Sequence, residues 1–190
     1  MKQHNKLNAI FIILAMVALV LACGGGSQTT EANKIVDTAN KKLDEAKELY
    51  SKTEDRNKKL FSADIRTVGQ LQYYKAEKDS EAKSIVSDYE KTSEMLKDIA
   101  KQYDDVSRLN LDEKYKEYAK LKSNEYNKRA EAVNIRKGNA QAFSEIDDPK
   151  IMMTKFDENN KKSDKLFTEA EEIGAKAKKI EEENKEIFKA

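Results

Sequence analysis

The stretch from Met152 to Ile187, MMTKFDENNKKSDKLFTEAEEIGAKAKKIEEENKEI, decides the fold of this chain. Within it, apolar, small or short polar residues recur in alternating steps of four and three. The repeating positions are Met152, Phe156, Asn159, Ser163, Leu166, Ala170, Ile173, Ala177, Ile180, Asn184 and Ile187. This spacing places them on one stripe of an α-helix, and its average period of about 3.5 is typical of left-handed, coiled-coil-like packing.

Two earlier stretches have the same periodicity. Their repeating positions are Ala32, Val36, Ala39, Leu43, Ala46, Tyr50, Thr53, Asn57 and Leu60, and then Ala82, Ile85, Tyr89, Thr92, Leu96, Ile99, Tyr103 and Val106. Between Leu111 and Ile146 the apolar residues cover a wider arc, which suits a helix that contacts two neighbours. The sequence therefore predicts four long helices.

Local capping signals predict where these helices begin. Asp148 followed by Pro149 is an N-cap with proline at the first helical position, so the fourth helix should begin there. Asn110, with Glu113 three residues later, resembles a capping box, so we expect the third helix to begin at Asn110 after the second ends near Ser107.

The boundary between the first two helices has the weakest signal. Ser62 and Asp64 are potential caps, and Thr67 with Gln70 forms another capping box, but no proline or glycine forces a turn at residues 62–66. The apolar stripe does not continue in register across this segment, so we predict a turn there.

The predicted fold is all-α, an elongated antiparallel four-helix bundle with up-down-up-down topology and coiled-coil-like packing. The composition agrees, because 37% of residues are charged and one proline leaves few obligate breaks, which argues against a turn-rich β fold. Spaced apolar residues, 38% of the chain, argue against disorder. Gly138 is either a helix end or a kink.

The amino-terminal segment has the features of a signal peptide. Lys2 and Lys6 provide a basic start, and residues 9–21 are almost purely apolar. A run of this length matches a signal-peptide core and is too short to span a bilayer. We therefore expect residues 1–22 to be a signal peptide.

The end of this segment, Val20-Leu21-Ala22-Cys23, resembles the lipobox of bacterial lipoproteins. The resemblance implies cleavage between Ala22 and Cys23, a lipid on Cys23, and attachment to a membrane through that lipid. Cys23 is the only cysteine, so it has no partner for an intramolecular disulfide. The alternatives are a plain secretory signal with a chance cysteine, or an uncleaved anchor.

The charge balance and the glycine positions indicate how the rest of the chain is divided and what it does not bind. The chain has 36 basic and 35 acidic residues, and cleavage would remove Lys2 and Lys6, which leaves a nearly neutral protein with no electrostatic case for binding nucleic acid. Residues 23–29, with three consecutive glycines, are expected to be a tether. Residues 30–190 are expected to form the helical domain.

Little in the sequence supports catalysis or a cofactor. The only histidine, His4, lies in the signal peptide, so the expected mature protein lacks imidazole for general base catalysis or metal ligation. There is no glycine-rich phosphate loop and no calcium-binding loop. We expect neither enzymatic activity nor a bound metal or cofactor.

Tyrosines are the candidate binding residues. Seven of the eight lie between residues 73 and 126. Tyr89 and Tyr103 fall on the apolar stripe and should be core residues. Tyr73 and Tyr74 are adjacent, about 100° apart on a helix, so at least one should be exposed, and together they form the candidate binding face.

Other stripe residues have two interpretations. The polar ones, Asn57 and Asn159 among them, either fix the helix register or line a ligand cavity. We expect Met152 to fill a gap in the core, and Ile173 and Ile180 to be buried core positions.

Two functional hypotheses follow. In the first, the chain is a non-enzymatic lipoprotein of the bacterial cell envelope that binds or spaces an envelope protein, a cell-wall polymer or a host molecule. In overall plan it is similar to helical cell-wall-binding lipoproteins of Gram-positive bacteria. In the second, it is a periplasmic four-helix domain that senses a small ligand between its helices. The membrane to which it attaches and its oligomeric state are left open.

Overall fold

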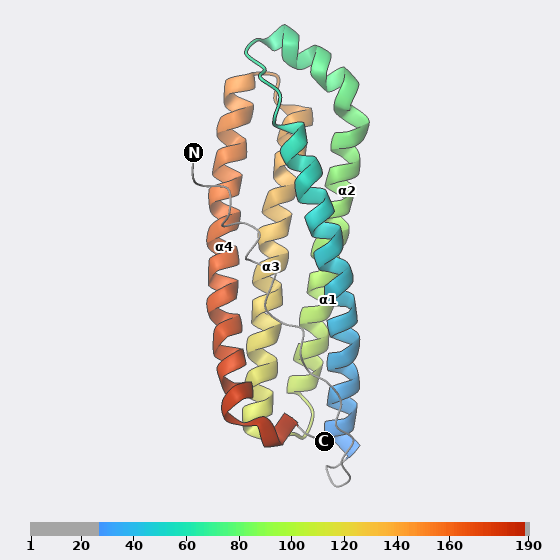
Figure 1. Ribbon diagram of the computed structural model, residues 1–190, viewed down its shortest axis with the longest axis vertical. Helices are drawn as coiled ribbons and strands as arrows, with labels where there is room; N and C mark the ends of the chain where they lie inside the picture. The colour runs from blue at the N-terminus through green and yellow to red at the C-terminus, as the bar shows by residue number, and fades with distance from the viewer. Residues whose placement is uncertain (1–26, 189–190) are drawn as a thin grey trace.

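The computed structural model describes residues 27–188, which form an elongated all-α bundle (Figure 1). Four long helices are followed by one short 3₁₀ helix: α1 (Ser27–Leu60), α2 (Val68–Ser107), α3 (Glu113–Glu145), α4 (Pro149–Glu183) and η1 (Lys185–Phe188). The described part of the chain contains no strand. The predicted fold class is confirmed.

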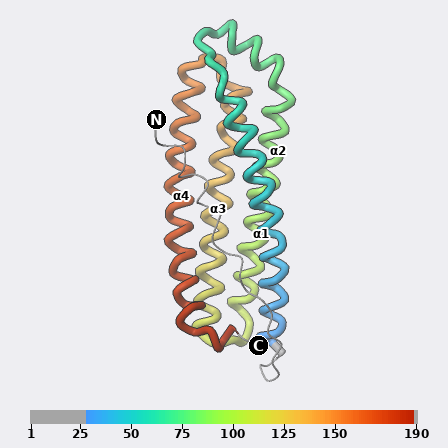
Figure 2. The backbone as a smooth tube through the Cα atoms, viewed as in Figure 1, coloured from blue at the N-terminus to red at the C-terminus, as the bar shows by residue number. Residues whose placement is uncertain are grey.

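Short connections make successive helices antiparallel, as the chain path in Figure 2 shows. The helix backbones approach closely in chain order, α1 on α2, α2 on α3 and α3 on α4. The seam between α4 and α1 is closed mainly by side chains. Rings of Tyr50 and Phe167 meet edge to face at 5.7 Å, and those of Phe61 and Phe156 stack at 4.3 Å.

The predicted start of the fourth helix is confirmed, and of the three candidate caps before the second helix the structure uses Thr67. Before α2, the Thr67 hydroxyl accepts a hydrogen bond from the Gln70 backbone N–H while the Gln70 side chain accepts one from the Thr67 N–H, so the capping box is complete. Before α4, the Asp148 side chain accepts from the backbone N–H groups of Lys150 and Ile151, with Pro149 first in the helix. The predicted turn between α1 and α2 is also present.

Two predicted boundaries differ from the structure, and one alternative that the sequence left open at Gly138 is excluded. The N-cap of α3 is Asp112 rather than Asn110, because the Asp112 carboxylate accepts from the Lys114 N–H at 2.7 Å. Helix α1 begins at Ser27, inside the expected tether, and the Gln28 side chain accepts a hydrogen bond from the Asn110 N–H. Gly138 lies inside α3, so it does not end a helix.

Helix α4 ends before its sequence stripe does. Asn184 is its C-cap, and the Asn184 side-chain amide donates to the Ile180 carbonyl oxygen. The next residues form η1, which places the Phe188 ring 4.6 Å from the Tyr115 ring and 5.0 Å from the Tyr118 ring. The last predicted stripe position, Ile187, therefore belongs to η1 and not to α4.

The core is a continuous apolar layer between the helices, and most stripe residues are buried in it. Met152 is buried, as expected. The prediction for Ile173 and Ile180 is wrong, because both side chains are only partly buried. In this lower half of α4, Ala170 and Ala177 face the core, and the isoleucines lie beside it.

Candidate binding surfaces

The predicted lipidation and cleavage residues lie outside the part of the chain that the structure describes. Cys23 and Ala22 precede Ser27, where α1 begins. The signal peptide and most of the expected tether lie outside it for the same reason. These assignments stay predictions from the sequence.

The structure separates the two tyrosines of the predicted binding face. Tyr73 is 77% exposed on the first turns of α2. Tyr74 is partly buried, and its ring packs edge-on against Phe143 at 5.8 Å, with the Lys78 ammonium 5.9 Å from the ring centre. Only the Tyr73 ring is accessible to a partner, whereas the Tyr74 ring packs against the core beneath this surface.

Exposed apolar side chains of the described residues gather at one end of the bundle. The large ones are Val68, Tyr73, Ile151 and Met153. They belong to the first turns of α2 and α4, which both begin at the top of Figure 1, whereas α1 begins at the bottom. We call these four residues the apolar tip. They lie at the same end of the bundle, on two helices whose backbones do not pack closely on each other, and exposed apolar side chains of this kind are candidate contact residues.

The other tyrosines are core residues, as predicted for Tyr89 and Tyr103. Their hydroxyls contact polar groups on neighbouring helices: Tyr89 donates to Glu54 at 2.6 Å, and Tyr115 to Asn33 at 2.8 Å. Burial raises the pKa of six tyrosine side chains above the ordinary value of 10.0, and nearby carboxylates or other tyrosines raise it further. These residues are Tyr50, Tyr89, Tyr103, Tyr115, Tyr118 and Tyr126.

These raised tyrosine pKa values predict loss of stability in alkali. The folded state holds the phenolic protons more tightly than the unfolded state, so this stabilisation is complete below about pH 10 and falls as the pH rises above it. Thermal unfolding followed by circular dichroism should show the midpoint dropping above about pH 10, with tyrosinate absorbance appearing as helicity is lost.

Tyr126→Phe is the matched variant, since it removes one buried phenol and keeps the ring. Its midpoint should fall less steeply with pH than that of the unmodified protein. A tyrosinate signal from most of the tyrosines in a protein that is still helical would contradict the assignment of these residues to the core.

A polar cluster at the centre of the upper half of the bundle joins three helices, and the sequence analysis missed it. Arg136, 5% exposed, donates to the Ser163 hydroxyl at 3.1 Å and pairs with Asp164 on α4. Its guanidinium lies 3.9 Å from Glu54 on α1. Burial lowers the pKa of Arg136, but the charges of Glu54 and neighbouring groups outweigh this effect and raise it.

A second buried charge cluster lies in the lower half. The Lys122 side chain, 2% exposed as a residue, pairs with Glu125 at 2.6 Å, and its ammonium lies 4.7 Å from the centre of the Tyr126 ring. Gly174 on α4 leaves room for Glu125, since a Cβ at this glycine would lie 2.9 Å from the carboxyl group. Both clusters are enclosed by their own ion pairs and are structural in character.

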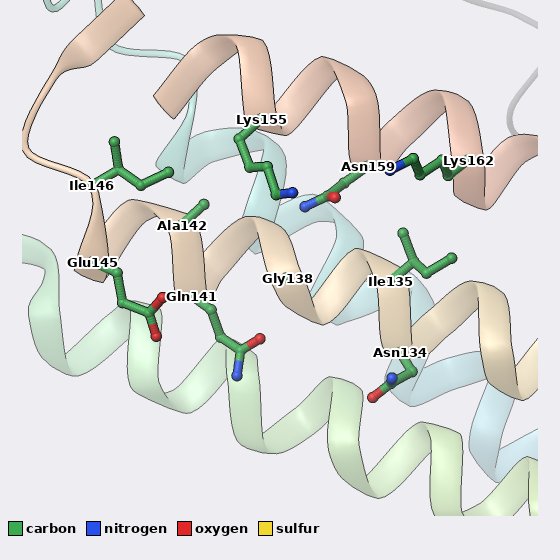
Figure 3. A pocket seen from close by; sticks show the side chains of 10 residues that line it. All are labelled: Asn134, Ile135, Gly138, Gln141, Ala142, Glu145, Ile146, Lys155, Asn159 and Lys162. Atoms are coloured by element: carbon green, nitrogen blue, oxygen red, sulfur yellow. The ribbon is translucent and has the colours of Figure 1, made fainter. Parts of the chain in front are cut away.

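An open groove of about 470 Å³ lies between α3 and α4 (Figure 3). Its α3 side is formed by Asn134, Ile135, Gly138, Gln141, Ala142 and Glu145, with Ile146 beyond the helix end, and its α4 side by Lys155, Asn159 and Lys162. This volume falls in the range of small-ligand sites. Asn159 is the one predicted polar stripe residue that lines this groove.

Within residues 27–188, no helix is both long enough and apolar enough to cross a membrane. In the same range, no three His, Cys, Asp or Glu side chains gather in a way that could hold a metal ion. No family model, curated protein or solved structure matches this chain.

Proposed function

We propose that this protein is a non-enzymatic lipoprotein, anchored through Cys23 to the extracytoplasmic side of a bacterial membrane, that binds or spaces another component of the cell envelope. The proposal rests first on the sequence: a basic start, an apolar run and the lipobox-like Val20-Leu21-Ala22-Cys23. Two or more acyl chains on one residue make membrane attachment stable. The partner would be an envelope protein, a cell-wall polymer or a host molecule.

The position of the apolar tip is the structural observation that supports a binding role. The tip lies at the end of the bundle opposite to the start of α1 (Figure 1). A helix of 34 residues is about 51 Å long at 1.5 Å per residue. A protein held at its amino-terminal end would therefore present Tyr73 and Ile151 far from the membrane surface.

Cys23→Ala tests the anchor. The variant should incorporate no fatty acid in cells fed an alkyne-labelled fatty acid, because the thiol that accepts the lipid is absent. Cys23→Ala combined with Ser27→Cys is the matched control, since it restores a thiol four residues further along and should also stay unlabelled. Normal processing and membrane partitioning of Cys23→Ala would refute the anchor.

A photo-crosslinking residue at position 73 tests the binding role in intact cells. It should capture a discrete partner, whereas the same residue at position 113 should not, because exposed Glu113 begins α3 at the opposite end of the bundle. Equal capture from both positions, or none from either, would contradict a binding surface at the apolar tip.

The second candidate function is a ligand-sensing domain. The observation that favours it is the groove beside Asn159. Two other polar stripe residues do not favour a ligand site. Ser163 is hydrogen-bonded to the Ala132 carbonyl and to Arg136, and Asn57 is buried away from the groove. A site in this protein would therefore lie between α3 and α4 and not along the central axis.

A further inference from the structure

The side-chain amide of Asn159 lies at the groove without a hydrogen-bond partner among residues 27–188. It is 6% exposed and lines the groove between α3 and α4, yet its side-chain amide makes no hydrogen bond to any residue in the described chain. Among its neighbours, Asn160 accepts a hydrogen bond from Asn139 Nδ2 at 2.9 Å and Ser163 donates to the Ala132 carbonyl at 3.0 Å, whereas the buried Asn139 Oδ1 has no partner in this part of the chain. The Asn159 amide opens onto the groove, so water can satisfy it there, and a polar group that enters the groove can replace that water.

The backbone of α3 leaves space for that group. Gly138 faces Asn159, and a Cβ at this glycine would lie 3.1 Å from Asn159 Nδ2. Any larger residue would reach into the groove and press on the amide. The glycine therefore keeps Asn159 accessible from the groove.

Two lysines without ion pairs lie on either side of Asn159. Lys155 precedes it by one turn, and Lys162 follows it by nearly one turn on the same face of α4. In Figure 3 both side chains extend along α4 towards Asn159. Neither forms a salt bridge with any described residue, whereas Lys128 on α3 pairs with Glu169 on α4 at 2.6 Å.

We propose that this groove binds an extended acidic peptide segment of a partner protein, with two side-chain carboxylates on Lys155 and Lys162 and the intervening main chain on Asn159. An Asn side chain donates and accepts at once, which matches the N–H and C=O groups of a peptide backbone. The proposal concerns the groove alone and does not depend on lipidation of Cys23.

The spacing fits two carboxylates three residues apart. The backbones of Lys155 and Lys162 are seven residues apart, which corresponds to about 10.5 Å along the helix axis, and this is the widest spacing their flexible side chains need to adopt to hold two carboxylates. In an extended polyproline II conformation, which has three residues per turn and rises about 3.1 Å per residue, side chains three positions apart lie on the same face and are separated by about 9 Å.

The remaining lining favours a peptide over a sugar. Ile135 and Ile146 provide an aliphatic wall, and none of the lining residues is aromatic, although aromatic rings are what usually stack on sugars. The acidic lining residue, Glu145, lies at the end of the groove near Ile146, and its side chain points away from α4 in Figure 3. Exposed Ile151, which belongs to the apolar tip, lies about one turn before Lys155 on α4.

The test uses the full chain in a mild detergent and a fluorescent peptide with blocked termini. The peptide carries two aspartates three positions apart, separated by leucine and alanine, and a control peptide has asparagines in their place. Fluorescence anisotropy should show saturable binding of the aspartate peptide, with binding of the control weaker by roughly tenfold or more, because charge-assisted hydrogen bonds are lost.

Charge-reversal variants locate the site. Lys155→Glu and Lys162→Glu should each weaken binding of the peptide by roughly tenfold. Lys161→Glu makes the same charge change on the exposed side of α4 outside the groove, and should alter binding by less than about twofold. Asn159→Ala should weaken binding without altering the net charge, and Gly138→Leu should block the groove. Circular dichroism of the exposed lysine variants verifies that they fold.

Three results would overturn the proposal. The first is no saturable binding of the aspartate peptide. The second is an equal loss in Lys161→Glu and Lys155→Glu, which would show nonspecific attraction to α4. The third is binding only of a peptide with a free terminal carboxylate, or of an acidic sugar, because either would identify a different occupant.

Discussion

Arg136→Met should destabilise the protein by about 3–5 kcal/mol, measured as the free energy of unfolding in denaturant. The arginine is buried between three helices, where it compensates Glu54 and supplies hydrogen bonds to α4. Without it, the Glu54 carboxylate, 5% exposed, has only neutral hydroxyl partners, those of Tyr89 and Tyr50. An uncompensated charge in this environment costs far more than the lost packing.

Two further variants show whether the charge is the cause. Adding Glu54→Gln to Arg136→Met should recover a large part of the loss, since glutamine can still accept the Tyr89 hydrogen bond without a charge to bury. Arg108→Met removes an arginine from an exposed pair with Asp104 and should cost less than about 1 kcal/mol. A loss for Arg136→Met as small as that for Arg108→Met would show that the central cluster is not a stabilising element.

Phe143→Ala should cost about 3–5 kcal/mol of unfolding free energy, because it leaves a cavity at a fully buried site. The Phe143 ring contacts the rings of Phe61 at 6.0 Å and Tyr74 at 5.8 Å, so α2, α3 and the turn after α1 lose packing at once. Chemical denaturation of the full chain is the measurement, with the slope of the transition as the test of two-state behaviour.

Tyr73→Ala is the matched exposed truncation. It should change the unfolding free energy by no more than about 0.5 kcal/mol while reducing capture of a partner at the apolar tip. Tyr74→Ala should fall between the two, because the Tyr74 ring packs on Phe143. If Tyr73→Ala destabilised the protein as much as Phe143→Ala, Tyr73 would be a core residue and the proposed binding surface would be lost.

Helix number and topology were predictable because they depend on periodicity and local capping. The cap at Asp148 was correct for the same reason, and Thr67 was among the three caps considered before α2, since each cap involves only residues within one turn. The start of α3 was misplaced because two acceptors, Asn110 and Asp112, compete within three residues. The end of α4 was misplaced because its stripe continues in sequence after the Asn184 side chain has capped the helix.

The groove between α3 and α4 and the cluster around Arg136 could not be predicted from periodicity, because each depends on how two or three helices face one another. Arg136 follows Val133 by three residues and precedes Ala140 by four, so an arginine on the α3 stripe was a signal that could have been noticed. For Asn159, the stripe position indicated burial. Only the facing glycine, Gly138, shows that its amide opens onto a groove and not onto a partner.

The order in which the helix backbones pack has a mechanical consequence. Helix α1 packs closely on α2 alone, and its seam with α4 is closed mainly by rings such as Tyr50 on Phe167. A pulling force on the residues before Ser27 would load α1 first and open that seam while α2, α3 and α4 keep their mutual contacts, because the least extensively packed segments yield at the lowest free energy. Under tension α1 would thus separate before the other helices, and the groove between α3 and α4 would retain its shape.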